Sequence, residues 1–119
     1  MRYHIASAGL AAVIVMGFGG GTAHAEIDGA DMYEVRCATC HGANGEGTKG
    51  RIPALGPPLR GNQFVVNAPE NVLRDVIRNG RQGMDRNYDD EYPNMPAFDY
   101  TMVDDMEALI EFLKGDLQN

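Results

Sequence analysis

The chain has 119 residues and a formal net charge of −7, with 10 Lys and Arg against 17 Asp and Glu. This length suggests a single domain. The acidic excess argues against a nucleic-acid partner, because nucleic-acid phosphates require a basic surface. It permits instead a protein partner that carries a basic docking patch.

Residues 1–25 are predicted to be a secretory signal peptide rather than part of the domain. A short positive start, residues 1–4, precedes an apolar run, residues 5–18, and Ala23-His24-Ala25 forms an A-x-A cleavage pattern. An uncleaved membrane anchor is the alternative, but the apolar run is short for a membrane span. We therefore expect cleavage after Ala25, a periplasmic domain of residues 26–119, and no membrane contact afterwards. Cleavage removes Arg2 and no acidic residue, so the net charge becomes −8.

The first predicted helix covers residues 29–40, with Asp28 as its N-cap. The second covers residues 68–79, where Asn67 and Glu70 stand at capping-box spacing and Gly80 provides the stop. Apolar residues recur at helical spacing along both the second helix and a third.

The third predicted helix covers residues 102–114, with Thr101 as N-cap and Gly115 as the stop. Between the helices, residues 42–61 and 81–100 are rich in Gly, Pro and Asn, and no alternating strand pattern of useful length is found. Long irregular segments in a compact domain need an object to wrap around. The sequence thus predicts an all-α fold of three main helices and long loops around a central group.

A C-x-x-C-H motif, Cys37 to His41, is the attachment signature of c-type haem. Cys37 and Cys40 are three residues apart, so they can reach two vinyl groups on one porphyrin edge, and His41 can then bind the iron. His41 is the single histidine left after cleavage of the leader. A zinc site would need four ligands, a thioredoxin-like pair would need a strand–helix scaffold, and a local disulfide is the third alternative.

The sixth iron position is predicted to be filled by methionine, because no second histidine remains and methionine is the other ligand of cytochromes c. Met95 is preferred over Met84, since flanking prolines at positions 93 and 96 stiffen its loop. Met32 lies on the attachment side of the chain, while Met102 and Met106 fall in the third predicted helix, where core packing is expected.

Over nearly all of residues 26–119 the chain resembles class I monohaem cytochromes c. The resemblance rests on the C-x-x-C-H motif, on GPPLRG at residues 56–61 and on Met-Pro-Ala-Phe at residues 95–98. It implies the cytochrome c fold, one covalent haem c with its iron, a Pro57 carbonyl that accepts the His41 N–H, and Leu59 packed on the haem.

The chain departs from this family in having no Trp, which in many members contacts a haem propionate. Candidates for that contact are the arginines and tyrosines of the loops, namely Arg51, Arg60, Arg81, Tyr88, Tyr92 and Tyr100. The sequence does not choose among them.

Ligation by His41 and Met95 would leave no open position on the iron, so we expect an electron-transfer protein and not an enzyme. It would carry electrons from a periplasmic dehydrogenase to a cytochrome or an oxidase. A haem subunit bound tightly to one dehydrogenase is the close alternative. A haem-based peroxidase or gas binder, which needs an open iron position, is the alternative from another class.

Overall fold

The computed structural model describes residues 28–88, 91–98 and 105–119. Its helices are α1 (Gly29–Arg36), α2 (Ala38–His41), α3 (Gln63–Asn67), α4 (Glu70–Asn79) and α5 (Met106–Lys114), with single 3₁₀ turns η1 (Gly83–Asp85) and η2 (Asp116–Gln118). The described residues form no strand, and their one isolated bridge pairs Arg81 with Met95. The predicted all-α class is thus confirmed.

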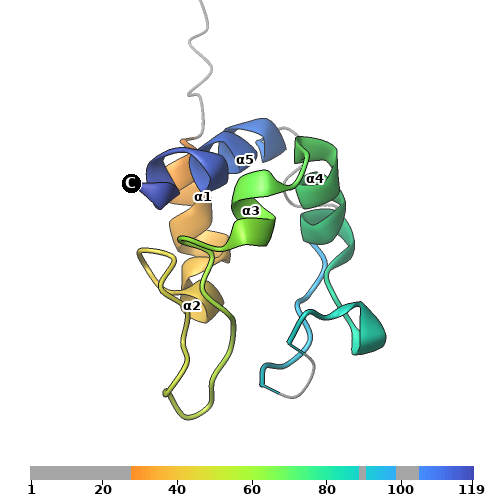
Figure 1. Cartoon of the computed structure of the whole chain (residues 1–119). Helices are drawn as coiled ribbons and strands as arrows, with labels where there is room; N and C mark the ends of the chain where they lie inside the picture. The colour runs from red at the N-terminus through yellow and green to blue at the C-terminus, as the bar shows by residue number, and fades with distance from the viewer. Residues whose placement is uncertain (1–27, 89–90, 99–104) are drawn as a thin grey trace, which may run out of the picture.

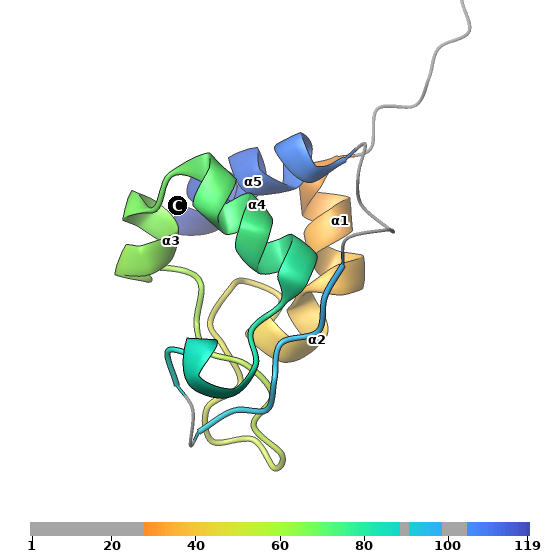
Figure 2. The ribbon, with the colours of Figure 1, turned by 90° about the vertical axis from the view of Figure 1, so that its right-hand side faces the viewer.

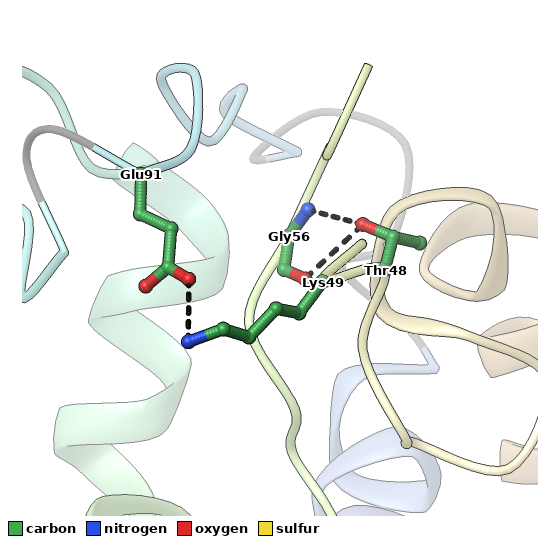
Figure 3. A network of polar contacts seen from close by, with 4 residues as sticks. All are labelled: Thr48, Lys49, Gly56 and Glu91. Atoms are coloured by element: carbon green, nitrogen blue, oxygen red, sulfur yellow. Dashed lines mark hydrogen bonds and ion pairs between the residues drawn. The ribbon is translucent and has the colours of Figure 1, made fainter. Parts of the chain in front are cut away.

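Helices α1, α3, α4 and α5 lie together at one end of the described chain, α2 follows α1 away from that end, and the two long loops extend in the same direction (Figures 1 and 2). One loop follows α2, and the other follows α4. An ion pair joins the two loops, with Lys49 Nζ 2.9 Å from Glu91 Oε1 (Figure 3). Hydrogen bonding to Glu91 raises the pKa of Lys49, but both groups are exposed, so water screens the pair.

The first predicted helix is present as two helices separated at Cys37. Asp28 is the N-cap as predicted, because its Oδ1 accepts the Ala30 N–H at 3.0 Å. Cys37 has φ −115°, which bends the chain, yet its N–H still donates to Tyr33 O and its carbonyl accepts the His41 N–H. The cysteine motif therefore occupies a bend and the single short helix that follows it.

Helix α3 was not predicted, and it overturns the predicted capping box. Asn62 Oδ1 accepts the Phe64 N–H at 3.0 Å and so begins α3, while Asn67 ends it. Pro69 is the N-cap residue of α4, with no side-chain hydrogen bond at that cap. Lys114 of α5 donates to carbonyls at the end of α3, including Val66 O at 3.2 Å.

Helix α4 ends at Gly80, as predicted, with φ +68°. A Cβ atom at Gly80 would collide with the Met95 carbonyl oxygen and lie 2.8 Å from the Pro96 carbonyl carbon. Glycine is therefore required both for the positive φ and for the close approach of residues 95–96. Leu73 and Ile77 form the buried face of α4.

Helix α5 begins at Met106, later than predicted, because Asp105 is its non-helical N-cap residue with φ −112°. The predicted Thr101 cap and residues 102–104 lie outside the described residues. Helices α1 and α5 cross so closely that a Cβ atom at Gly29 would collide with the Ala108 carbonyl oxygen. The rings of Tyr33 and Phe112 meet beside this crossing, with centroids 5.5 Å apart. The core around the crossing includes Leu109 and Ile110, which are almost fully buried.

Candidate haem-binding site

The attachment motif is presented at the bend between α1 and α2. Cys37 precedes α2, and Cys40 and His41 form its last residues. Both thiols are free and half-buried. Burial, and to a smaller extent the neighbouring Cys40, raises the pKa of the Cys37 thiol to about 12, which favours its S–H form before haem is attached.

His41 is held in one tautomer by the chain itself. Its Nδ1 lies 2.8 Å from Pro57 O. Because a carbonyl oxygen can accept but not donate, Nδ1 carries the proton and Nε2 keeps its lone pair. Burial lowers the pKa of His41, and the Pro57 bond offsets part of that effect. The imidazole is therefore neutral and able to bind a metal through Nε2.

A cleft opens beside this imidazole, between the helices and the two loops. It contains about 880 Å³ of empty space, measured out to its open mouth. Its walls include Cys37 and His41 from the motif, Pro57 and Leu59 from the first loop, and Met95 from the second. Apolar side chains from α3, α4 and α5 complete much of the surface, among them Phe64, Leu73, Val76, Ile77 and Leu113. Cys40 is not part of the wall.

Met95 and Met84 differ sharply in their surroundings. Met95 lines the cleft, and its backbone pairs with Arg81 through hydrogen bonds of 2.9 and 3.1 Å. Met84 is 98% exposed and does not line the cleft. Met106 is buried in the core, where Met32 also packs, and Met102 lies outside the described residues. Among the described methionines, Met95 is therefore the one on the cleft.

The cleft also has polar residues, and three of them are among the predicted candidates for a propionate contact. Arg81, Tyr88 and Tyr92 line it, whereas the exposed Arg51 and Arg60 do not, and Tyr100 lies outside the described residues. The Arg81 guanidinium carbon lies 4.8 Å from the centroid of the Phe64 ring, a cation–π contact at the cleft wall.

Three polar lining residues were missed, namely Asn62, Arg86 and Asn87. Arg86 Nη1 donates to Tyr92 O at 2.6 Å, and Asn87 Oδ1 accepts from Arg81. The sequence signal available was the polar run from residue 81 to residue 88. That run does not by itself reveal which of its members turn toward the cleft.

These residues fit a covalently attached haem. A neutral imidazole with a free Nε2, a thioether and a thiol share one cleft, and a second thiol lies one residue before the imidazole. Mostly apolar walls with a few arginines suit a flat apolar ring that carries carboxylates. The parts of the chain that are described hold no group of three His, Cys, Asp or Glu residues placed to bind a metal ion.

Curated relatives match part of the chain. The cytochrome subunit of a fructose dehydrogenase from Gluconobacter japonicus is 38% identical over 71 residues, 60% of this chain and 13% of the relative. The cytochrome c subunit of a quinone alcohol dehydrogenase from Gluconacetobacter polyoxogenes is 39% identical over 56 residues, 47% of this chain and 11% of the relative. The cytochrome c subunit of a cytochrome bc1 complex from Corynebacterium efficiens is 33% identical over 60 residues, 50% and 17% of the two chains. The match thus spans less than a fifth of the length of each of these relatives.

Among solved structures, the c-type cytochrome XoxG from Methylobacterium extorquens is similar, with a TM-score of 0.48 and 19% identity. The match covers 76% of this chain and 51% of that one. The family described as Cytochrome c matches residues 27–115, most of the sequence and every residue of the site above. The chain therefore belongs to the cytochrome c family, as an electron-transfer protein whose cofactor is haem c, attached covalently.

Proposed function

We propose that this chain is an exported one-electron carrier whose haem iron is bound by His41 on one side and Met95 on the other. The observation that carries the proposal is the single cleft lined by Cys37, His41 and Met95. A neutral imidazole nitrogen and a thioether sulfur are the axial pair used in cytochromes c.

The chain's own residues have distinct parts in this proposal. Cys37 and Cys40 would each add an S–H group across one vinyl group, which needs no oxidant. Pro57 O holds the proton of His41 on Nδ1 and so would leave Nε2 free to bind the iron. Leu59 contributes apolar surface to the cleft wall and would pack on the ring.

Met95 would fill the last coordination position, so that no substrate or gas reaches the iron. Its backbone is paired with Arg81, which fixes the point from which the side chain extends into the cleft. When bound, the haem supplies one-electron chemistry between the ferric and ferrous states. The protein would keep water away from that centre by the apolar residues of α3, α4 and α5.

The proposed partners are redox proteins: a dehydrogenase as donor and a cytochrome or oxidase as acceptor. The similar proteins are named as cytochrome subunits of dehydrogenases and of a bc1 complex, which supports partners of this kind. The net charge of −7 supports a partner with a basic docking patch. The same names support the second candidate, a haem subunit bound to one dehydrogenase. Copurification of the chain with an enzyme would favour that subunit over a free carrier.

We also propose export to the periplasm with cleavage after Ala25, leaving residues 26–119 as the cytochrome c domain. The pattern of residues 1–25 supports this, and those residues lie outside the described structure. None of the helices that the structure describes has the length and apolar character needed to cross a bilayer. Determining the N-terminal residue of the purified protein tests the cleavage site.

The central test uses protein produced in a cell that attaches haem c. The wild type should give the pyridine haemochrome spectrum of c-type haem and a weak far-red band from sulfur bound to ferric iron. Met95→Ala should lose that band and lower the reduction potential, while Met84→Ala should keep both. A band that survives in Met95→Ala and disappears in Met84→Ala would overturn the ligand assignment.

Carbon monoxide separates the carrier from the peroxidase or gas binder. Ferrous wild type should bind carbon monoxide poorly at neutral pH, because Met95 occupies the position, whereas ferrous Met95→Ala should bind it readily. Rapid binding by the wild type would count against an electron carrier and in favour of an open-site haem protein.

A further inference from the structure

Thr48 lies in the loop that follows the attachment motif, and its side chain is 1% exposed. Its Oγ1 accepts the N–H groups of Leu55 at 2.7 Å and Gly56 at 2.9 Å. The same hydroxyl lies 3.1 Å from Cys40 O and 3.2 Å from Gly56 O, where its one proton can be donated. One donor and two acceptor positions are all that a hydroxyl has, so its capacity is filled.

The hydrogen-bond partners of Thr48 are next in sequence to His41 and Pro57, the two residues of the His41–Pro57 hydrogen bond. Cys40 immediately precedes His41, and Leu55 and Gly56 immediately precede Pro57, whose carbonyl accepts from His41 Nδ1. The Thr48 N–H also donates to Gly56 O at 3.0 Å. Figure 3 shows the two contacts that the Thr48 hydroxyl makes with Gly56 N and Gly56 O. One buried hydroxyl therefore ties together the two chain segments that carry the donor and the acceptor.

The segments around Cys40 and Gly56 approach each other so closely that a small backbone shift would change the distance between His41 and Pro57. A Cβ atom on Gly56 would lie 2.6 Å from Cys40 O and 3.1 Å from His41 Nδ1. Thr48 itself does not line the cleft. Any influence on the haem must therefore pass through the backbone that Thr48 contacts, at Cys40 beside His41 and at residues 55–56 beside Pro57.

We infer that Thr48 is a positioning residue that sets the strength of the His41–Pro57 hydrogen bond and, through it, the reduction potential. The inference rests on the proposed function, because it requires His41 to bind the iron. A firm bond from Nδ1–H to a carbonyl makes the imidazole a more basic ligand, which favours ferric iron and lowers the potential.

Thr48→Val keeps the shape of the side chain and removes its hydroxyl. The N–H groups of Leu55 and Gly56 then lack a partner in a buried site, so this segment moves toward water and Pro57 O withdraws from Nδ1. We expect the potential of the haem-loaded variant to rise and the His41 Nδ1–H to exchange with solvent faster, as measured by spectroelectrochemistry and NMR.

Three further variants separate positioning from general stability. Thr48→Ser keeps the oxygen and should restore the wild-type potential and exchange rate, while Thr48→Ala should behave like Thr48→Val. Leu109→Ala removes fully buried core packing at a residue that does not line the cleft, so it should lower the melting temperature without changing the potential or the exchange rate. If Thr48→Val does not accumulate as folded protein, the comparison of Thr48→Ser with Thr48→Ala, which differ by one oxygen atom, tests the inference.

Equal potentials and equal exchange rates in Thr48→Ala and Thr48→Ser would overturn the inference and leave Thr48 a structural residue. A shift of the same size in Leu109→Ala would also overturn it, because stability alone would then explain the effect. Failure of the proposed function looks different. In that case the wild type itself lacks a c-type haem spectrum, or the far-red band survives in the Met95→Ala variant.

Discussion

Arg81 and Met95 exchange two backbone hydrogen bonds, from Arg81 N–H to Met95 O at 3.1 Å and from Met95 N–H to Arg81 O at 2.9 Å. The pair joins the residue after the α4 stop to the predicted axial ligand, and both residues line the cleft. Helix α4 is itself fixed by its buried face, so it provides a rigid support for the Met95 loop.

Gly80→Ala is expected to loosen that support. A Cβ atom there meets the Met95 carbonyl oxygen, and the φ of +68° costs a non-glycine residue roughly 1–2 kcal/mol. We expect at least this loss in the free energy of unfolding and a weakened far-red band, with covalent haem retained. The matched control is Gly50→Ala, where φ is +86° but no atom lies within 4 Å. An equally weakened band in both variants would show that the contact with Met95 is unimportant.

Gly29→Ala is expected to separate α1 from α5. Alanine favours a helix over glycine by about 1 kcal/mol, so propensity alone predicts stabilisation. The new Cβ atom, however, collides with Ala108 O and lies 2.7 Å from Ala108 C, and such overpacking costs about 1–3 kcal/mol. We expect net destabilisation in chemical unfolding. Glu34→Ala, exposed on the same helix, should change stability by less than about 0.5 kcal/mol. A more stable Gly29→Ala protein would contradict the close crossing.

Arg86→Gln is expected to lower the reduction potential. A positive charge on the cleft wall disfavours the more positive ferric state, so its removal favours oxidation. The shift should be on the order of tens of millivolts, where about 59 mV is a tenfold change for one electron. Arg78→Gln, exposed on α4 away from the cleft wall, has the same charge change and should shift the potential less. Equal shifts would indicate an effect of net charge alone.

Glu46 is expected to contribute to acid sensitivity. Its carboxylate accepts the backbone N–H groups of Glu46 and Asn44, and these bonds lower its pKa from 4.5 in the folded protein. A lowered folded pKa gives stability that is present above the unfolded pKa and is lost as the pH falls through the folded value. Glu46→Gln should therefore lose less stability than the wild type as the pH falls below about 4.5.

Melting temperatures between pH 7 and pH 3 measure this effect. Glu34→Gln, on the exposed side of α1, makes the same chemical change and should follow the wild-type curve. If Glu46→Gln follows the wild-type curve as well, the hydrogen bonds to its carboxylate do not contribute.

The features that depend on local spacing could be predicted from the sequence. The C-x-x-C-H motif, the Asp28 cap and the Gly80 stop depend on neighbouring residues alone, and the structure has both helix ends as expected. The His41–Pro57 bond came from family resemblance and is present at 2.8 Å. The family, the helical fold and the covalent haem c are likewise confirmed.

The predictions that failed concern features that depend on contacts between segments distant in the sequence. Helix α3 has five residues, too few for an apolar period to be detected. Lys114 of α5 donates hydrogen bonds to the carbonyl groups at its end. Asn67 stands at capping-box spacing but lies within α3, so the chain uses Pro69 instead to begin α4. Arg86 and Asn87 reach the cleft because the chain after Arg81 must return to pair with Met95.

The two sides of the cleft differ in how much chain must be closed to form them. Pro57 follows His41 by 16 residues, whereas Met95 follows it by more than three times that number. Closing the longer loop costs about 1 kcal/mol more in chain entropy. The imidazole side should therefore assemble first during folding. The sulfur side should be the first part of the molecule to detach under stress, while the covalently held ring stays in place and guides its return.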